Sequence, residues 1–347
     1  MKEPNLFFIL IGGSMNSITN ELHHAKFSDA TRPPTERKVP ELSLNSYLQG
    51  GISERARFIE QFFIGLKDYG FIVLKDHPVE IKLIKRAYEL MEELFALPVA
   101  NKRNYALFDH GFQRGYTPFG TEHAKNNPIS DLKEFWHVGR EITKGHRYEQ
   151  FYFENVWPTE IKEFKSVFSQ IYQALDETGK ILLETLAAPL DVPAGFLSSM
   201  VSDGNSILRL LHYPPIPAGS DPRSIRAAAH EDINFITILV SATSSGLQLK
   251  DRDGAWLDVV SDPNSLIVDA GDMLARLTND VIPSTTHRVV NPVDSNTSRY
   301  SMPFFMHPNP DALLSCLASC RGAGAKYPDI TSQDFLLQRL REIGLMK

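Results

Sequence analysis

The stretch that decides the fold runs from residue 230 to residue 301 of the 347-residue chain. It contains, in order, His230-Glu231-Asp232, Gly246-Leu247-Gln248-Leu249, Asp269-Ala270-Gly271-Asp272, Ser284-Thr285-Thr286-His287-Arg288-Val289-Val290 and Arg299-Tyr300-Ser301. Four of its side chains support one chemical prediction. His230, Asp232 and His287 bind a metal ion, and Arg299 binds an anion beside it.

The spacing of the three metal-binding candidates has a physical reason. Residues i and i+2 of a β-strand point to the same face, so we expect His230 and Asp232 to converge on one ion. His287 lies 287 − 230 = 57 residues later, which is enough chain for it to return on a neighbouring strand. Two imidazoles and one carboxylate leave positions open, as in Fe(II) enzymes that bind an organic ligand and dioxygen. A structural zinc site normally has four protein ligands, and the sequence offers no obvious fourth.

Arg299 and Ser301 have the same i, i+2 relation and share a face. A guanidinium presents a planar fork to a carboxylate, and a hydroxyl adds another donor. Beside the metal, this pair would bind the far carboxylate of a keto acid whose other end chelates iron. The alternative is that all these polar groups only satisfy one another.

The order of these segments resembles the isopenicillin N synthase-like family of non-haem Fe(II), 2-oxoglutarate-dependent dioxygenases. The segments 69–77, 115–118 and 155–158 are also similar to family segments, so the resemblance covers roughly residues 38–310. It implies a mainly β fold with flanking helices. The core would be a distorted double-stranded β-helix, a cupin-like jelly roll with iron at one mouth.

The resemblance also implies the chemistry. Fe(II), 2-oxoglutarate as cosubstrate and O2 would oxidise a small organic substrate, with release of succinate and CO2. Hydroxylation is the expected outcome, and desaturation or ring closure are variants of it. Tyr213 matches the family tyrosine that donates to the cosubstrate, together with Arg299 and Ser301. Leu211 stands where several members carry an asparagine, which removes one donor.

Substrate contacts are expected from six residues. Asn234 shares the expected face of Asp232, and Phe305 matches an aromatic position near the family's substrate pocket. Arg209 either forms a surface salt bridge or lines the pocket, where it would attract an acidic group. Three aromatic residues of an irregular region either touch substrate or pack in the core: Tyr116, Phe119 and Trp136.

Two other functions stay open from the residues. Some members of the resembling family, including the name-giving synthase, keep the Arg-x-Ser pair yet act as Fe(II) oxidases without a keto acid. A non-oxidative metal-binding protein, such as a hydrolase or a small-molecule binder, is the more distant alternative. A requirement for 2-oxoglutarate separates the first alternative from the dioxygenase, and a preference for zinc without oxygen consumption would indicate the second.

Composition limits the partners. The formal net charge is −6 and no long basic run occurs, so nucleic acid is not an expected partner. The apolar run 6–11 is far shorter than the ~20 residues of a spanning helix, so no membrane partner is expected either. Met15 is a candidate for the true start. Cys316 and Cys320 are the only cysteines; as reduced thiols they favour a cytoplasmic location. The oligomeric state is left open by the sequence.

The chain divides into four expected parts. Residues 1–37 form a tail or linker, and 38–200 an N-terminal α/β region whose helices back the barrel. Residues 201–310 form the β-helix core, and 311–347 a helical tail. Within these parts we expect a helix at 53–69 capped by Ser53 and a helix at 159–188 capped by Thr159. A terminal helix is expected from Thr331. We also expect a strand at 207–213 and a hairpin around 251–254.

Overall fold

The computed structural model describes residues 37–108, 112–123, 129–221, 223–292 and 296–342. Nearly all of the expected N-terminal tail, including Met15, lies outside these ranges. The described elements run in the order β1 (Glu41–Ser43), α2 (Asn45–Leu48), α3 (Ile52–Tyr69), β2 (Phe71–Lys75), α4 (Ile81–Ala96), α5 (Val99–Arg103), β3 (Gly115–Thr117), β4 (Glu134–Gly139), η4 (Glu149–Phe151), α6 (Phe164–Thr185), α7 (Phe196–Met200), β5 (Ile207–Tyr213), β6 (Ala227–His230), β7 (Ile236–Val240), β8 (Leu247–Lys250), β9 (Trp256–Asp258), β10 (Leu266–Ala270), α8 (Asp272–Leu277), β11 (His287–Val289), β12 (Arg299–Met306), η5 (Ala318–Cys320) and α9 (Ser332–Glu342).

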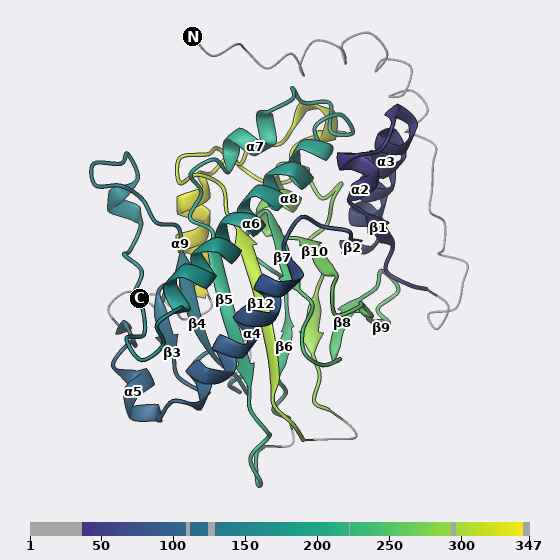
Figure 1. The fold of residues 1–347 in the computed structure, drawn as a ribbon. Coiled ribbons are helices and arrows are strands. Elements are labelled where there is room, and N and C mark those ends of the chain that lie inside the picture. The colour runs from purple at the N-terminus through teal and green to yellow at the C-terminus, as the bar shows by residue number, and fades with distance from the viewer. Residues whose placement is uncertain (1–36, 109–111, 124–128, 222, 293–295, 343–347) are drawn as a thin grey trace.

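Two sheets form the framework. The larger has the strand order β1-β2-β10-β7-β12-β5-β4-β3, and the smaller has the order β6-β11-β8-β9. Every pairing is antiparallel except that of β1 with β2. Figure 1 shows helices α4 and α6 crossing one face of the large sheet, while β8 and β9 stand at its side. The expected mainly β, jelly-roll architecture with flanking helices is therefore confirmed.

The large sheet separates two hydrophobic clusters, because alternate residues of each strand face opposite sides. In β2, Ile72 and Leu74 belong to the cluster shared with the helices, whereas Phe71 and Val73 belong to the cluster between the sheets. In β5, Leu208 and Leu210 face the helices. The other face of β5 points into the barrel, and the polar side chains of interest lie there.

The helices cover the outer face with apolar stripes. α6 buries Phe164, Phe168, Ile171 and Leu175, which recur at the three- and four-residue spacing of a helix. No helix within the described ranges is both long and apolar enough to cross a membrane.

Most expected elements form, but two helix starts differ from prediction. β5 spans residues 207–213, and β8 and β9 pair as a hairpin around the turn at 251–254. The helix expected from Ser53 begins at Ile52, and the amide of Gly51 donates to Glu54 Oε2 at 2.8 Å. The longest helix begins only at Phe164, so Thr159 does not cap it. Instead, the amide of Thr159 donates to the hydroxyl of Tyr105 at 3.0 Å.

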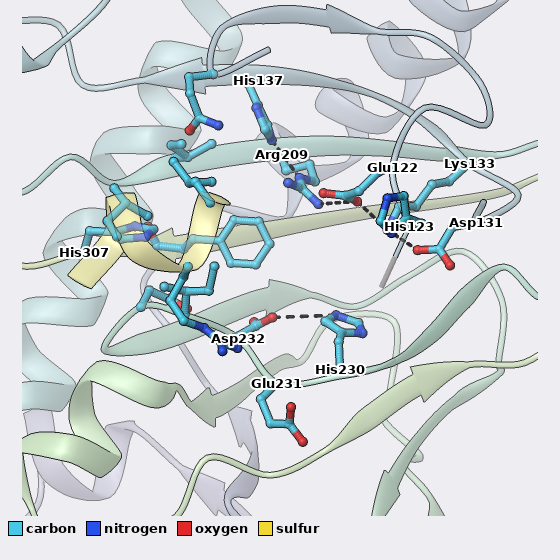
Figure 2. Close-up of a pocket in the computed structure, with 18 of the residues that line it drawn as sticks. Glu122, His123, Asp131, Lys133, His137, Arg209, His230, Glu231, Asp232 and His307 are labelled. Carbon is cyan, nitrogen blue, oxygen red and sulfur yellow. Dashed lines mark hydrogen bonds and ion pairs between the residues drawn. The ribbon is translucent and has the colours of Figure 1, made fainter. Parts of the chain in front are cut away.

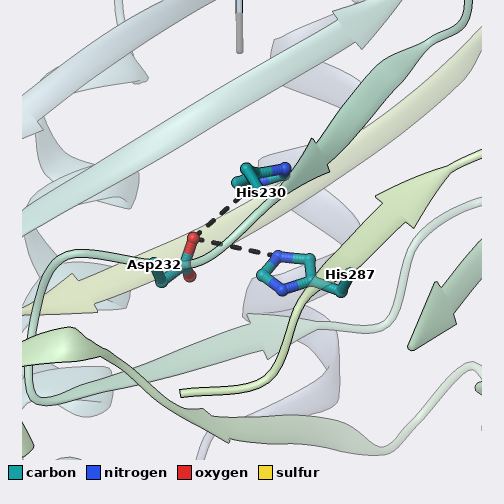
Figure 3. A group of neighbouring side chains, drawn as sticks. All are labelled: His230, Asp232 and His287. Atoms are coloured by element: carbon teal, nitrogen blue, oxygen red, sulfur yellow. Dashed lines mark ion pairs between the residues drawn. The ribbon is translucent and has the colours of Figure 1, made fainter. Parts of the chain in front are cut away.

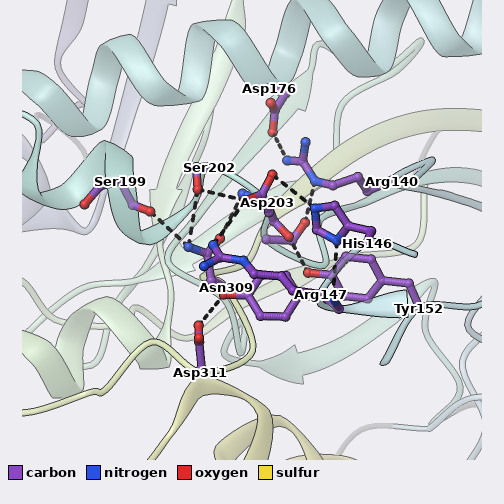
Figure 4. Close-up of polar contacts among 12 residues, drawn as sticks. Arg140, His146, Arg147, Tyr152, Asp176, Ser199, Ser202, Asp203, Asn309 and Asp311 are labelled. Atoms are coloured by element: carbon purple, nitrogen blue, oxygen red, sulfur yellow. Dashed lines mark hydrogen bonds and ion pairs between the residues drawn. The ribbon is translucent and has the colours of Figure 1, made fainter. Parts of the chain in front are cut away.

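A polar network anchors the segment that follows β4 (Figure 4). The Arg140 guanidinium donates to Asp176 on α6 at 2.6 Å and to the carbonyl of Gly204 at 2.7 Å. The amide of Asp203 donates in turn to Asn309 at 2.8 Å. These contacts join α6, the residues before β5 and the segment after β12. We therefore assign these polar side chains a structural role.

Gly70 sets how closely α3 approaches the segment that carries His287. It ends α3 with φ of +70°, and its amide donates to Leu66 O at 2.9 Å. A Cβ at this position would lie 2.0 Å from Thr285 Oγ1 and 2.7 Å from Thr285 Cβ. Glycine is thus required here by both the backbone conformation and the packing.

Replacing Gly70 with alanine should lower the melting temperature more than the same change at Gly145. Both glycines have positive φ, so both substitutions carry the backbone cost of about 1–2 kcal/mol. Only Gly70 meets a neighbour, because nothing lies within 4 Å of a Cβ at Gly145. Thermal unfolding of the two variants measures the difference. Equal melting temperatures would show that Thr285 moves aside at no cost.

Candidate metal centre

The pairing of β6 with β11 brings two histidines together. The register places His287 opposite His230, in antiparallel strands of the small sheet. The prediction that His287 returns on a neighbouring strand is confirmed. The two imidazole centroids lie 4.4 Å apart.

Asp232 reaches the same point by a different route from the one expected. β6 ends at His230, so Asp232 lies in the loop before β7 and not on a shared strand face. The start of α8 fixes this loop: the amides of Asp272 and Met273 donate to the carbonyls of Asp232 and Ile233 at 2.7 and 3.1 Å. A Cβ on Gly271 would lie 2.9 Å from the Asp232 carbonyl oxygen, so glycine permits the close approach.

The three side chains form a compact donor set (Figure 3). Asp232 Oδ1 lies 3.7 Å from His230 Nε2 and 3.8 Å from His287 Nε2. One donor atom from each residue lies within 4.8 Å of the others, and among the described residues this is the group that could hold a metal ion. Two imidazole nitrogens and one carboxylate oxygen fit Fe(II) and leave positions for other ligands.

Backbone carbonyls orient both imidazoles. His230 Nδ1 lies 2.7 Å from Ala228 O, and His287 Nδ1 lies 3.1 Å from Thr285 O. Since a carbonyl only accepts, both Nδ1 atoms carry the proton and both Nε2 lone pairs face the centre. Burial and the neighbouring His230 lower the pKa of His287 to about 4, so its imidazole is neutral at neutral pH.

The second oxygen of Asp232 is also held. Thr237 on β7 donates its hydroxyl to Asp232 Oδ2. Asn234 supports the arrangement, since its Nδ2 donates to the Ile236 carbonyl at 2.7 Å and lies 3.2 Å from the Thr237 hydroxyl. Oδ2 is thus occupied, and Oδ1 is left to face the two histidines.

The predicted anion-binding residues gather inside the barrel. Arg299 on β12 pairs in register with Tyr213 on β5, and Ser301 pairs with Leu211. The Arg299 guanidinium lies over the Tyr213 ring at 5.1 Å, and its Nε donates to Ser244 O at 3.1 Å. Its Nη1 is buried with no hydrogen-bond partner among the described residues. A buried charged donor without an acceptor is costly, so this site fits the carboxylate of a cosubstrate.

A cavity of about 310 Å³ opens beside the metal centre (Figure 2). Three predicted substrate residues line it together with His230 and Asp232, namely Arg209, Asn234 and Phe305. Helix α9 closes one side with Leu336, Arg339 and Leu340.

Arg209 belongs to a cluster of buried charges at this cavity. Its Nη1 donates to Glu122 at 3.2 Å, and Lys133 contacts Glu122 at 2.6 Å and Asp131 at 2.8 Å. Burial raises the pKa of the Glu122 carboxyl, but Arg209 and Lys133 outweigh it and hold that pKa well below its usual range. Glu122 and Asp131 thus provide two carboxylates for the two cations, Arg209 and Lys133.

The orientation of Arg209 is fixed by neutral partners as well. Its Nε donates to His137 Nε2 at 2.7 Å, and His137 Nδ1 donates to Phe112 O at 2.8 Å. Burial and the charge of Arg209 lower the pKa of His137 well below its usual value, in agreement with this neutral tautomer. The guanidinium plane lies between Phe135 at 4.2 Å and Phe305 at 5.1 Å.

The other three predicted substrate residues do not line this cavity. Tyr116 is buried and donates its hydroxyl to Glu134, and Trp136 packs in the outer core. Phe119 is 41% exposed. Sequence reasoning did not single out Glu122, Asp131, Lys133 or Thr237.

Comparisons with known proteins agree with the geometry. Residues 204–308 match the 2OG-Fe(II) oxygenase superfamily, and residues 39–160 match the family described as non-haem dioxygenase in morphine synthesis N-terminal. A relative from Emericella nidulans, the "2-oxoglutarate-Fe(II) type oxidoreductase hxnY", is 33% identical over 81% of this chain and 83% of its own length.

Solved structures show the same fold. A 2OG-Fe(II) oxygenase family protein from Caulobacter crescentus is 44% identical, with a TM-score of 0.79, over 88% of this chain and 99% of that one. A full-length Neurospora crassa protein in complex with alpha-KG (2-oxoglutarate) and thymine is 29% identical, also with a TM-score of 0.79. That likeness covers 87% of this chain and 96% of that one.

Replacing Thr237 with valine should weaken metal binding by roughly 10- to 100-fold, the usual effect of losing a partner that orients a ligand. Valine keeps the shape but cannot donate to Asp232 Oδ2. Titration with Fe(II) under nitrogen, or with Mn(II), measures the affinity. Thr278→Val is the matched control. The buried Thr278 hydroxyl contacts backbone carbonyls of α8 and the carbonyl and amide of Ile282, and none of the proposed metal ligands. Equal metal affinities of both variants would contradict the role of Thr237.

Proposed function

The chain belongs to the 2OG-Fe(II) oxygenase superfamily, and we propose that His230, Asp232 and His287 are its iron ligands and that Arg299, Ser301 and Tyr213 bind its cosubstrate. The protein is a 2-oxoglutarate-dependent dioxygenase that uses Fe(II), 2-oxoglutarate and O2. Iron held by these ligands would activate O2, which is the oxidant: one oxygen atom enters the succinate formed as 2-oxoglutarate loses CO2, and the other oxidises a small organic substrate, by hydroxylation or a variant of it.

The observation that carries these assignments is the pairing of two incomplete sites in one barrel. The three donors of the metal centre have their remaining polar atoms satisfied and aim one atom each at a common point. Arg299 is buried on the strand pair β5–β12, and its Nη1 has no partner among the described residues. A keto acid with two carboxylates is the ligand class that supplies both sites at once.

The residues of the chain then have separate tasks. Arg299 holds the far carboxylate, and Ser301 and Tyr213 add hydroxyl donors from the same barrel face. Leu211, opposite Ser301, contributes no donor and instead packs in the inner cluster. The cavity beside the metal holds the substrate, and its apolar walls, Phe305 and the α9 leucines, exclude water from the reacting bond.

The balanced charges around Arg209 determine the proposed substrate class. Glu122 already neutralises Arg209, and rings cover both faces of its guanidinium. Its Nε and Nη1 are used, so Nη2 is the edge available to a ligand. We therefore infer an uncharged substrate with a carbonyl or similar acceptor, not the acidic group that Arg209 alone would attract. The thymine bound by the Neurospora crassa neighbour is uncharged and carries such carbonyls.

The remaining assignments follow from general properties of the chain. We infer a cytoplasmic enzyme, since both cysteines are free and buried. We also infer that neither nucleic acid nor a membrane is a partner, in view of the net charge of −6.

Adding 2-oxoglutarate to the anaerobic Fe(II) protein should produce a visible charge-transfer absorption band. The band should be lost in His287→Ala, which lacks an iron ligand. It should need a higher 2-oxoglutarate concentration in Arg299→Ala, by about tenfold or more, because a charge-assisted hydrogen bond contributes about 1.5–3 kcal/mol. Arg147→Ala, an exposed arginine far from the ligands in sequence, is the control and should behave as wild type.

The outcomes separate the alternatives. Iron binding without any band would contradict the keto-acid site and favour a direct oxidase. Failure of the wild type to bind Fe(II) would contradict the assignment of all three ligands.

Among matched pairs of small molecules, the uncharged member should stimulate succinate release. Suitable pairs are thymine with uracil-5-carboxylate and benzamide with benzoate. Glu122→Gln should shift the preference towards the carboxylate, because it leaves Arg209 and Lys133 opposed by Asp131 alone. Stronger stimulation of the wild type by the anions would contradict the proposed substrate class.

A further inference from the structure

A second buried arginine lies near Arg299. Arg226 directly precedes β6 and is 1% exposed, while Arg299 begins β12 and is 2% exposed. The Arg226 Nη2 donates to the carbonyl of Thr297, two residues before Arg299. Through this bond Arg226 is held against the segment that leads into Arg299, and burial and the charge of Arg299 both lower the pKa of Arg226.

Neither arginine has an acidic partner among the described residues. Arg226 donates to the carbonyl of Thr297, and Arg299 donates to the carbonyl of Ser244 and hydrogen-bonds the Tyr213 side chain, so all these partners are uncharged. The ionisable groups that shift the pKa of Arg226 are Arg299 and Tyr213, and those that shift the pKa of Arg299 are Tyr213 and Tyr88. Two positive charges are therefore buried together without a compensating carboxylate from the described part of the chain.

Each guanidinium also has an unused donor. Arg226 Nε and Arg299 Nη1 are both buried and without a hydrogen-bond partner among the described residues. A guanidinium stays charged in proteins, so neither group can avoid the cost of burial by losing its proton. Such a pair is stable only when an anion with several acceptor positions completes it.

Arg226 differs in this respect from Arg114, another fully buried arginine among the described residues. Arg114 donates through Nε, Nη1 and Nη2 to Phe153 O, Gln113 O and Asn205 Oδ1. Its donors are distributed over protein acceptors, as expected of a structural arginine. Arg226 makes one such bond, to Thr297 O, and its Nε finds no acceptor in the described ranges.

We propose that Arg226 is a second arginine of the cosubstrate site and that it acts with Arg299 on the far carboxylate of 2-oxoglutarate. This inference rests on the proposed function, in which that carboxylate lies at Arg299. Tyr213, which influences both guanidiniums, completes the group of donors. A carboxylate has about four acceptor positions, so it can take bonds from both arginines and from a hydroxyl.

A dicationic site has a measurable consequence for specificity. The far carboxylate is bound by two positive charges, and a keto acid that lacks it leaves both uncompensated. The second arginine should therefore increase discrimination between 2-oxoglutarate and 2-oxovalerate, which has the same chain length and no far carboxylate.

The test is calorimetric titration of the full-length Mn(II) protein with each keto acid. We expect Arg226→Gln to bind 2-oxoglutarate at least tenfold more weakly and 2-oxovalerate as wild type does. Arg223→Gln is the matched control, because Arg223 lies three residues away, is 75% exposed at its side chain and pairs with Asp221. Its affinities should be unchanged.

Three results would overturn the inference. The first is an unchanged affinity of Arg226→Gln for 2-oxoglutarate. The second is an equal loss of affinity for both keto acids, which would indicate a structural role. The third is an equal loss of 2-oxoglutarate affinity in Arg223→Gln. If Arg226→Gln does not fold, Arg226→Lys decides: it keeps the charge without the planar fork, and we expect a smaller loss confined to 2-oxoglutarate. An unchanged ratio of the two affinities in Arg226→Lys would also overturn the inference.

Arg299→Gln separates this inference from the function on which it rests. If Arg299→Gln binds 2-oxoglutarate as tightly as wild type, the proposed cosubstrate site is wrong. If Arg299→Gln loses affinity and Arg226→Gln does not, only the second arginine is wrong.

Discussion

The register between β6 and β11 is the constraint on which the site depends. His287 lies opposite His230, while Val289 lies opposite Ala227, so β6 advances three residues where β11 advances two. This bulge turns His230 without disturbing the pairing of the inner residues Ala227 and Val289, which pack between the sheets. A slip of one residue would turn an imidazole to the opposite face. The apolar packing between the sheets therefore holds the metal centre as well as the fold.

The features that could be predicted from the sequence are those that follow from the two-residue alternation of side chains along a strand. Alternation along β5 placed Arg209, Leu211 and Tyr213 on one face, and the inner cluster contains the last two. The same rule succeeded for Arg299 and Ser301, which pair in register with Tyr213 and Leu211. For Asp232 the rule correctly predicted a position beside His230, but the reason was wrong. Asp232 lies outside the strand, and the backbone amides at the start of α8 hold its loop. Contacts of that kind join segments about 40 residues apart, and no local pattern encodes them.

The helix ends and the substrate cavity were less predictable for related reasons. Ser53 and Gly51 are both acceptable caps, and the choice follows from the bond between Gly51 and Glu54. The charges Glu122, Asp131 and Lys133 are unremarkable in the sequence, and they become informative only once they surround Arg209 in space. An isolated arginine predicts an acidic ligand, whereas the same arginine beside Glu122 does not. The ligand that a buried charged residue can bind therefore depends on its ion-pair partners and not on its residue type alone.

That principle distinguishes the two positively charged regions of the barrel. At the cavity, each cation has a carboxylate within the protein, so no net charge is left for a ligand to neutralise. At Arg226 and Arg299 the described residues supply only carbonyls and tyrosine, and in our proposal the neutralising charge comes from the cosubstrate. Arg226 directly precedes β6 and Arg299 begins β12, whereas the charges around Arg209 at the cavity come from Glu122, Asp131 and Lys133, which lie between β3 and β4. Similarity at the level of the fold therefore carries over the reaction and its cosubstrate, while in our proposal the choice of substrate depends on Glu122, Asp131 and Lys133, which are not part of the sheets.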